Sequence, residues 1–149
     1  MNSILTRVVI TALLLLLSMS IAVAEQALPQ YMIQTKVWMD GELRGEPLLQ
    51  VEANSEAMIT QQVNEGSAWR MNVLVEAPGE HENAIEGAIW LKLSIEEEVD
   101  GEWAFLTDTM LGLPAGQTGN LSVVDEGIEI ATPENARLFV EVTVEPVSE

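Results

Sequence analysis

Apolar and polar residues alternate along several stretches of this chain, which is the pattern of β-strands that bury one face. In residues 89–96, four apolar side chains share one face: Ile89, Leu91, Leu93 and Ile95. Residues 137–145 repeat the pattern with Leu138, Val140, Val142 and Val144. Both stretches are therefore predicted to be strands with one face in a core.

About eight short strands of this kind are predicted, separated by turn residues. Such close spacing, with no helical period after the N-terminal segment, indicates an all-β protein. We expect an antiparallel β-sandwich, with a small barrel as the alternative. We also expect Greek-key connections, because the loops at 78–83 and 112–119 are long enough to cross between sheets.

The acidic run at 96–102 predicts the tip of a β-hairpin. With a two-residue turn at Asp100-Gly101, the carboxylate of Asp108 would point into the core. A three-residue loop at 99–101 shifts the register by one residue, which turns Asp108 to solvent and buries Phe105. We therefore expect the three-residue loop.

The N-terminal segment has the features of an export signal. A basic residue, Arg7, precedes an apolar run, and the small residues Ala22-Val23-Ala24 follow it. This order predicts a signal peptide over 1–24, cleaved between Ala24 and Glu25, and a single sandwich domain over 25–149. An uncleaved membrane anchor is the alternative reading of the same apolar run. We expect a periplasmic or secreted protein with no membrane insertion after cleavage.

The chain is strongly acidic, with 24 Asp and Glu against 6 Lys and Arg and a formal charge of −18. Cleavage after Ala24 would remove one Arg and no acid, leaving 5 basic and 24 acidic residues, or −19. A surface of this sign repels phosphate backbones and anionic lipids, which excludes nucleic-acid binding. If the charge serves recognition, the expected partner is a basic protein or peptide. The alternative is that the charge only keeps an exported protein soluble or suits a saline habitat. The chain has no Cys, so it has neither disulfides nor a thiolate metal site.

The acidic hairpin tip is the first candidate site, because Ca²⁺ takes six to eight oxygen ligands from loop carboxylates and carbonyls. The candidate ligands are four acids of the tip: Glu96, Glu98, Asp100 and Glu102. The tip lacks the EF-hand pattern, and successive acids on a strand point to opposite faces. A solvated hairpin tip explains the same residues, so calcium is the one possible cofactor and is weakly indicated.

No catalytic constellation is recognisable in the sequence. His81, the only histidine, stands between Glu80 and Glu82, and one imidazole without thiolates gives too few ligands for structural zinc. No serine lies in a G-x-S-x-G motif, and no pair of carboxylates is distinguished from the rest. We therefore expect a protein that is not an enzyme.

Trp90 and Lys92 form the candidate protein-binding site. Trp90 lies on the strand face opposite the apolar stripe, so an exposed face would make it an interface anchor. Packing under a loop or over a sheet edge is the alternative. Together these features predict an exported, acidic β-sandwich that acts as a binding or accessory module in the cell envelope or outside the cell. The alternatives are an inhibitor of a basic exported enzyme and a small calcium- or carbohydrate-binding protein.

Overall fold

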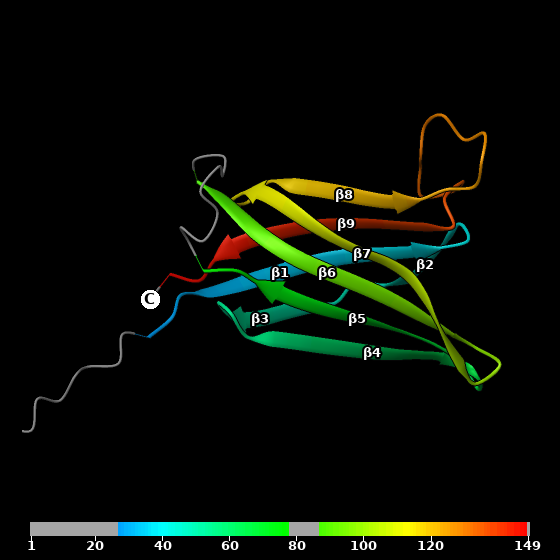
Figure 1. The fold of residues 1–149 in the computed structure, drawn as a ribbon, viewed down its shortest axis with the longest axis horizontal. Coiled ribbons are helices and arrows are strands. Elements are labelled where there is room, and N and C mark those ends of the chain that lie inside the picture. Colours follow the sequence, from blue (N-terminus) through cyan, green and yellow to red (C-terminus); the bar gives the residue numbers. More distant parts are fainter. Residues whose placement is uncertain (1–26, 78–86, 149) are drawn as a thin grey trace, which may run out of the picture.

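The computed structural model describes residues 27–77 and 87–148, which form two antiparallel sheets packed face to face (Figure 1). The described ranges contain nine strands and no helix. The strands are β1 (Gln30–Met39), β2 (Glu42–Gly45), β3 (Leu48–Glu52), β4 (Glu56–Asn64), β5 (Ser67–Val75), β6 (Ala88–Val99), β7 (Glu102–Pro114), β8 (Thr118–Val123) and β9 (Leu138–Pro146). The fold is thus the predicted β-sandwich, and its sheets do not close into a barrel.

The first sheet, sheet A, has the order β2-β1-β9-β8, and β3 continues the line of β2 along β1. Glu46 and Pro47 separate β2 from β3, since proline has no N–H for a strand ladder. The carbonyl of Pro47 nevertheless accepts the backbone N–H of Thr35, at 3.0 Å. One edge of sheet A is therefore divided into two short strands.

The second sheet, sheet B, has the order β4-β5-β6-β7, in which every strand pairs with its neighbour in the chain. The tip between β6 and β7 is formed by Asp100 and Gly101, with φ of 54° and 81°. Asp40 and Gly41 have nearly the same angles, 49° and 81°, at the tip between β1 and β2. Positive φ at both central residues suits the twist of a two-residue hairpin, which explains the repeated Asp-Gly pair.

The Greek-key connections expected from the loop lengths do not occur. The segment at 78–83, expected to cross between sheets, lies outside the described residues but joins β5 to β6, which are neighbours in sheet B. The chain changes sheet between β3 and β4 and between β7 and β8, with short connections at adjacent sheet edges. Strands β4 to β7 follow one another in sheet B, β8 pairs with β9 in sheet A, and β9 returns to pair with β1.

The core lies between the sheets and is formed by the inward residue of each alternating pair. Its largest fully buried side chains include Trp69, Met71, Leu91, Leu93, Ile95, Ile33 and Leu138. The apolar stripes predicted at 89–95 and 138–144 both belong to it. Burial of these side chains at roughly 25 cal/mol per Å² is the main force that joins the two sheets.

The register of the β6–β7 hairpin differs from the expected one. Val99 pairs with Glu102, so the tip is a two-residue turn and the expected three-residue loop at 99–101 is wrong. The register shifts farther from the tip, where Glu96 pairs with Phe105 and Ile95 with Thr107, leaving Leu106 as the extra residue of a β-bulge. Asp108 thereby pairs with Ser94 on the outer face, and Phe105 is exposed.

Candidate protein-binding surface

The outer face of sheet B carries a connected group of aromatic and charged side chains near the hairpin tips. Cross-strand pairing aligns Arg70 on β5, Glu96 on β6 and Phe105 on β7 in one row. The next row toward the tips holds Glu98 and Trp103. These rows bring together residues from three strands that the sequence separates.

Arg70 joins the charged and aromatic parts of this group. Its Nε donates a hydrogen bond to Oε2 of Glu96, and its guanidinium lies 4.2 Å from the centroid of the Trp103 ring. The hydrogen bond from Arg70 lowers the pKa of Glu96, and the same bond raises the pKa of Arg70. Trp103 is therefore held in place by a guanidinium that is itself fixed by a carboxylate.

Apolar side chains are exposed around this Arg70–Glu96–Trp103 group. Phe105 is 65% exposed and Trp103 is 37% exposed. Met58 on β4 and Met110 on β7, on the same face, are 63% and 38% exposed. Exposed aromatic and methionine side chains set among polar groups are the usual composition of a binding patch. We call Phe105, Trp103, Met58 and Met110 the sheet B patch.

Carboxylates surround the sheet B patch. Glu56, Glu98 and Asp108 lie on the same outer face of the strands that carry it. Glu56 and Asp108 line a groove of about 180 Å³ on this face, together with Lys92, Asn72 and Ser94. The patch is thus an apolar area in an acidic surround, which would complement a basic surface with an apolar contact of its own.

Trp90, the predicted anchor, lies on the outer face of sheet B but is half-buried. A Cβ added at Gly112 of β7 would be 2.9 Å from Cη2 of Trp90, so the indole covers the glycine across the strand pair. Lys92, its predicted companion, is ion-paired with Glu76 at 3.0 Å. The alternative reading of Trp90, packing over the strand at the edge of its sheet, therefore describes its position.

The structure does not gather the four predicted calcium ligands into one site. Glu96 is engaged by Arg70, and Glu98 pairs with Trp103 on the outer face. Asp100 is in the turn, and Glu102 is opposite Val99. Within 27–77 and 87–148, no three His, Cys, Asp or Glu side chains are grouped so that they could hold a metal ion. His81, Glu80 and Glu82 lie outside the described residues.

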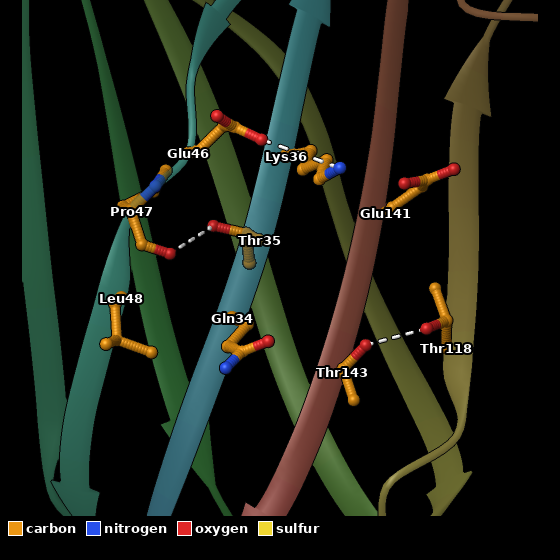
Figure 2. Close-up of a pocket in the computed structure, with 9 residues that line it drawn as sticks. All are labelled: Gln34, Thr35, Lys36, Glu46, Pro47, Leu48, Thr118, Glu141 and Thr143. Carbon is orange, nitrogen blue, oxygen red and sulfur yellow. Dashed lines mark hydrogen bonds and ion pairs between the residues drawn. The ribbon is translucent and has the colours of Figure 1, made fainter.

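A second concave area lies on the outer face of sheet A (Figure 2). This groove of about 370 Å³ crosses β1, β9 and β8, and Pro47 and Leu48 border one side of it. Thr118 and Thr143 hydroxyls are 2.7 Å apart across it, and Lys36 pairs with Glu46 at 3.5 Å. The residues that line it provide hydrogen-bonding groups but include no aromatic ring.

The sequence-based prediction of the binding site did not include Arg70, Phe105, Met58 or Met110, and it chose Trp90 in preference to Trp103. Trp103 and Phe105 are two residues apart in a strand, so they had to share a face. The sequence did contain a clue to their position. In a hairpin with a two-residue turn, Trp103 is opposite Glu98, so both aromatic residues lie on the same strand face as Glu96 and Glu98. The assumption that large aromatics are buried outweighed that signal.

Comparison of the chain with protein families, with curated proteins and with solved structures gives no match. Among the residues that the structure describes, no helix has the length and hydropathy that a membrane span requires. Function must therefore be argued from the surface itself.

Proposed function

We propose that this protein is an exported, acidic, non-enzymatic binding module that docks a basic protein on the outer face of sheet B. The observation that carries the proposal is the exposure of Phe105 and Trp103 inside an acidic surround. Tryptophan and arginine are the residue types that most often dominate binding energy, and here Trp103 and Arg70 are in contact.

The fixed position of the Trp103 ring before binding supports the proposed docking surface. Trp103 is stacked by Arg70, which is in turn bound by Glu96, so the aromatic ring loses little freedom when a partner covers it. Phe105 has no such support and is 65% exposed, which leaves most of its ring available for burial. Phe105 and Trp103 together therefore offer a partner two adjacent aromatic rings, one largely exposed and one already held in position.

The net negative charge of the protein indicates which class of protein it would bind. The formal charge of −18 attracts basic proteins at long range and speeds their association. Salt screens this attraction, with a Debye length of about 10 Å at 0.1 M. Binding through this face is therefore expected to weaken as the salt concentration rises.

The test is affinity capture from an extract of the exported proteins of the source organism. The bait is the mature chain, compared with Phe105→Ser and with Leu43→Ser, which alters a residue that is 50% exposed on sheet A. The proposal predicts a basic protein that the wild type and Leu43→Ser retain, that Phe105→Ser loses, and that salt elutes. Equal capture by all three baits, or capture that salt does not affect, would overturn it.

Inhibition of a basic exported enzyme is a second candidate, favoured by the loop between β8 and β9. Ile130 in this loop is 76% exposed. The Asn135 side chain donates to the Ile130 carbonyl at 3.0 Å and accepts the Thr132 N–H at 2.8 Å. An apolar side chain on a hydrogen-bonded loop is suited to insertion into a partner. Ile130→Ser in the same capture assay would then lose the enzyme, whereas Phe105→Ser would keep it.

A further inference from the structure

Strand β4 forms a free edge of sheet B, and in Figure 1 it borders the sheet below β5. Among the described strands it pairs with β5 alone. An edge strand presents unpaired backbone N–H and C=O groups, which form a template for another strand. Proteins ordinarily guard such edges with charges, prolines, bulges or short strands.

The other sheet edges of this protein carry such guards. The β2–β3 edge is divided by Pro47 and has a register shift opposite β1. Strand β7 has the bulge at Leu106 and the charged residues Glu102 and Asp108. Strand β8 has six residues. Each of these edges is interrupted, charged or short.

Strand β4 has little of this protection. It has nine residues without proline or glycine, and its single charged residue is Glu56 at the start. Its one irregularity lies near the other end, between Gln62 and Asn64. Met58 on this strand is 63% exposed. The stretch from Met58 to Gln62 is therefore a regular, uncharged edge in a strongly acidic protein.

We propose that β4 pairs antiparallel with β4 of a second copy of this chain, with the two-fold axis at Thr60. This register sets Thr60 opposite Thr60 and Met58 opposite Gln62 of the other copy. Glu56 is opposite Asn64, so no carboxylate opposes a carboxylate. The two sheets B join into one continuous sheet, and both strands of the new pair satisfy their free backbone groups.

The residues of β4 favour pairing with a second copy of the chain over pairing with a basic segment of another protein. A basic partner gains from carboxylates, and β4 offers one, at its first residue. A second copy instead meets a row of side chains complementary to its own, as an isologous two-fold interface requires. The inference is separate from the two aromatic anchors of the proposed function, because Trp103 and Phe105 are on β7, at the opposite side of the sheet from β4. Met58 is the one residue of the sheet B patch that lies on β4.

Charge determines how the association responds to salt. Each copy carries a formal charge of −18 at full length, or −19 after the expected cleavage, so the two copies repel each other at long range. Salt shortens the Debye length to about 3 Å at 1 M, which weakens the repulsion and leaves the short-range backbone hydrogen bonds intact. Self-association is therefore expected to strengthen with salt, which is the opposite of the response expected for a basic partner.

Sedimentation velocity on the mature chain, over a range of protein and salt concentrations, tests the proposal. We expect a monomer–dimer equilibrium that shifts toward dimer as salt rises. Thr60→Glu places a carboxylate opposite itself across the axis, and should raise the dimer dissociation constant about tenfold or more. Asn72→Glu is the matched control, because it adds the same charge to an exposed outer-face site on β5, one strand inside the edge.

Circular dichroism and thermal melting establish that both variants are folded. A wild type that stays monomeric at every protein and salt concentration would overturn the inference, and so would equal weakening by Thr60→Glu and Asn72→Glu. Phe105→Ser should leave the dimer unchanged, so failure of this inference is distinct from failure of the proposed function. Hydrogen exchange gives a second readout, with slower exchange of β4 amides in the dimer.

Discussion

Trp69 of sheet B packs against Gly45 of sheet A across the core. A Cβ at Gly45 would lie nearest to the side-chain oxygen of Gln61, which ends a flexible side chain, and 2.9 Å from Cζ2 of the packed Trp69 indole. Trp69 is fully buried, and among the described residues its indole N–H has no hydrogen-bond acceptor. The glycine therefore provides the space that the largest core side chain fills.

Gly45→Ala should destabilise the fold by about 1 to 3 kcal/mol, because the added methyl group overpacks the indole. Denaturant unfolding measures the change, seen as a lower midpoint at unchanged slope. Trp69→Phe provides the control, since the smaller ring relieves the clash. The double variant should then be less destabilised than the sum of the two single variants. A Gly45→Ala protein as stable as the wild type would show that the ring and strand β2 can separate freely.

The Arg70–Glu96 pair predicts a specific response to acid. The pKa of Glu96 is lowered in the folded protein, chiefly by the hydrogen bond from Arg70. A lowered folded pKa contributes stability that is complete above the ordinary glutamate pKa of about 4.3 and is lost as pH falls through the lower folded pKa. Glu96→Gln should therefore destabilise the protein near neutral pH, and its melting temperature should converge on that of the wild type in acid.

Acid also changes the net charge of the whole protein, so the quantity to follow is the difference in melting temperature between wild type and Glu96→Gln at each pH. Glu102→Gln, at an exposed position of β7, is the matched control for removal of one negative charge. The difference in melting temperature between Glu102→Gln and the wild type should not shrink in acid, whereas the difference for Glu96→Gln should. If both variants gave the same pH profile, the Arg70 contact would have no measurable role in stability.

Trp90 and Phe105 should respond differently to truncation. Trp90 is half-buried over Gly112, so Trp90→Ala should lower stability by about 2 kcal/mol, below the range for fully buried tryptophans. Phe105 is largely exposed, so Phe105→Ser should change stability by about 0.5 kcal/mol or less. Thermal melting of both variants in one buffer makes the comparison. An unchanged melting temperature for Trp90→Ala would show that packing over Gly112 contributes little to stability.

Local patterns were enough to predict much of the fold. The alternation at 89–96 and 138–144 predicted both strands and their buried faces, since a side-chain period of two is intrinsic to an extended chain. The acidic run at 96–102 predicted the hairpin tip between β6 and β7, where Gly101 accepts positive φ, although the two-residue turn that forms is not the expected loop. Residues 128–131 contain β-branched side chains but form no strand. A high β-propensity alone does not make a strand, because a strand also needs a partner strand to pair with.

The hairpin register shows where local reasoning failed. Asp108 avoids the core, as expected, because a carboxylate without a partner is costly to bury. The expected three-residue loop at the tip is wrong, because the extra residue is Leu106 within strand β7. A bulge can occupy any of several positions in a ladder, and packing of Leu106 against the core selects this one.

The sequence by itself determined the charge, the strand periodicity and the turn chemistry, since each depends on residues adjacent in the chain. Only the tertiary structure decided which side chains form a surface. Arg70 meets Glu96 and Trp103 because β5, β6 and β7 lie side by side, and the bulge at Leu106 sets the faces on which Phe105 and Asp108 lie. Contacts between distant segments depend on sheet order and register, which are settled when the whole core packs.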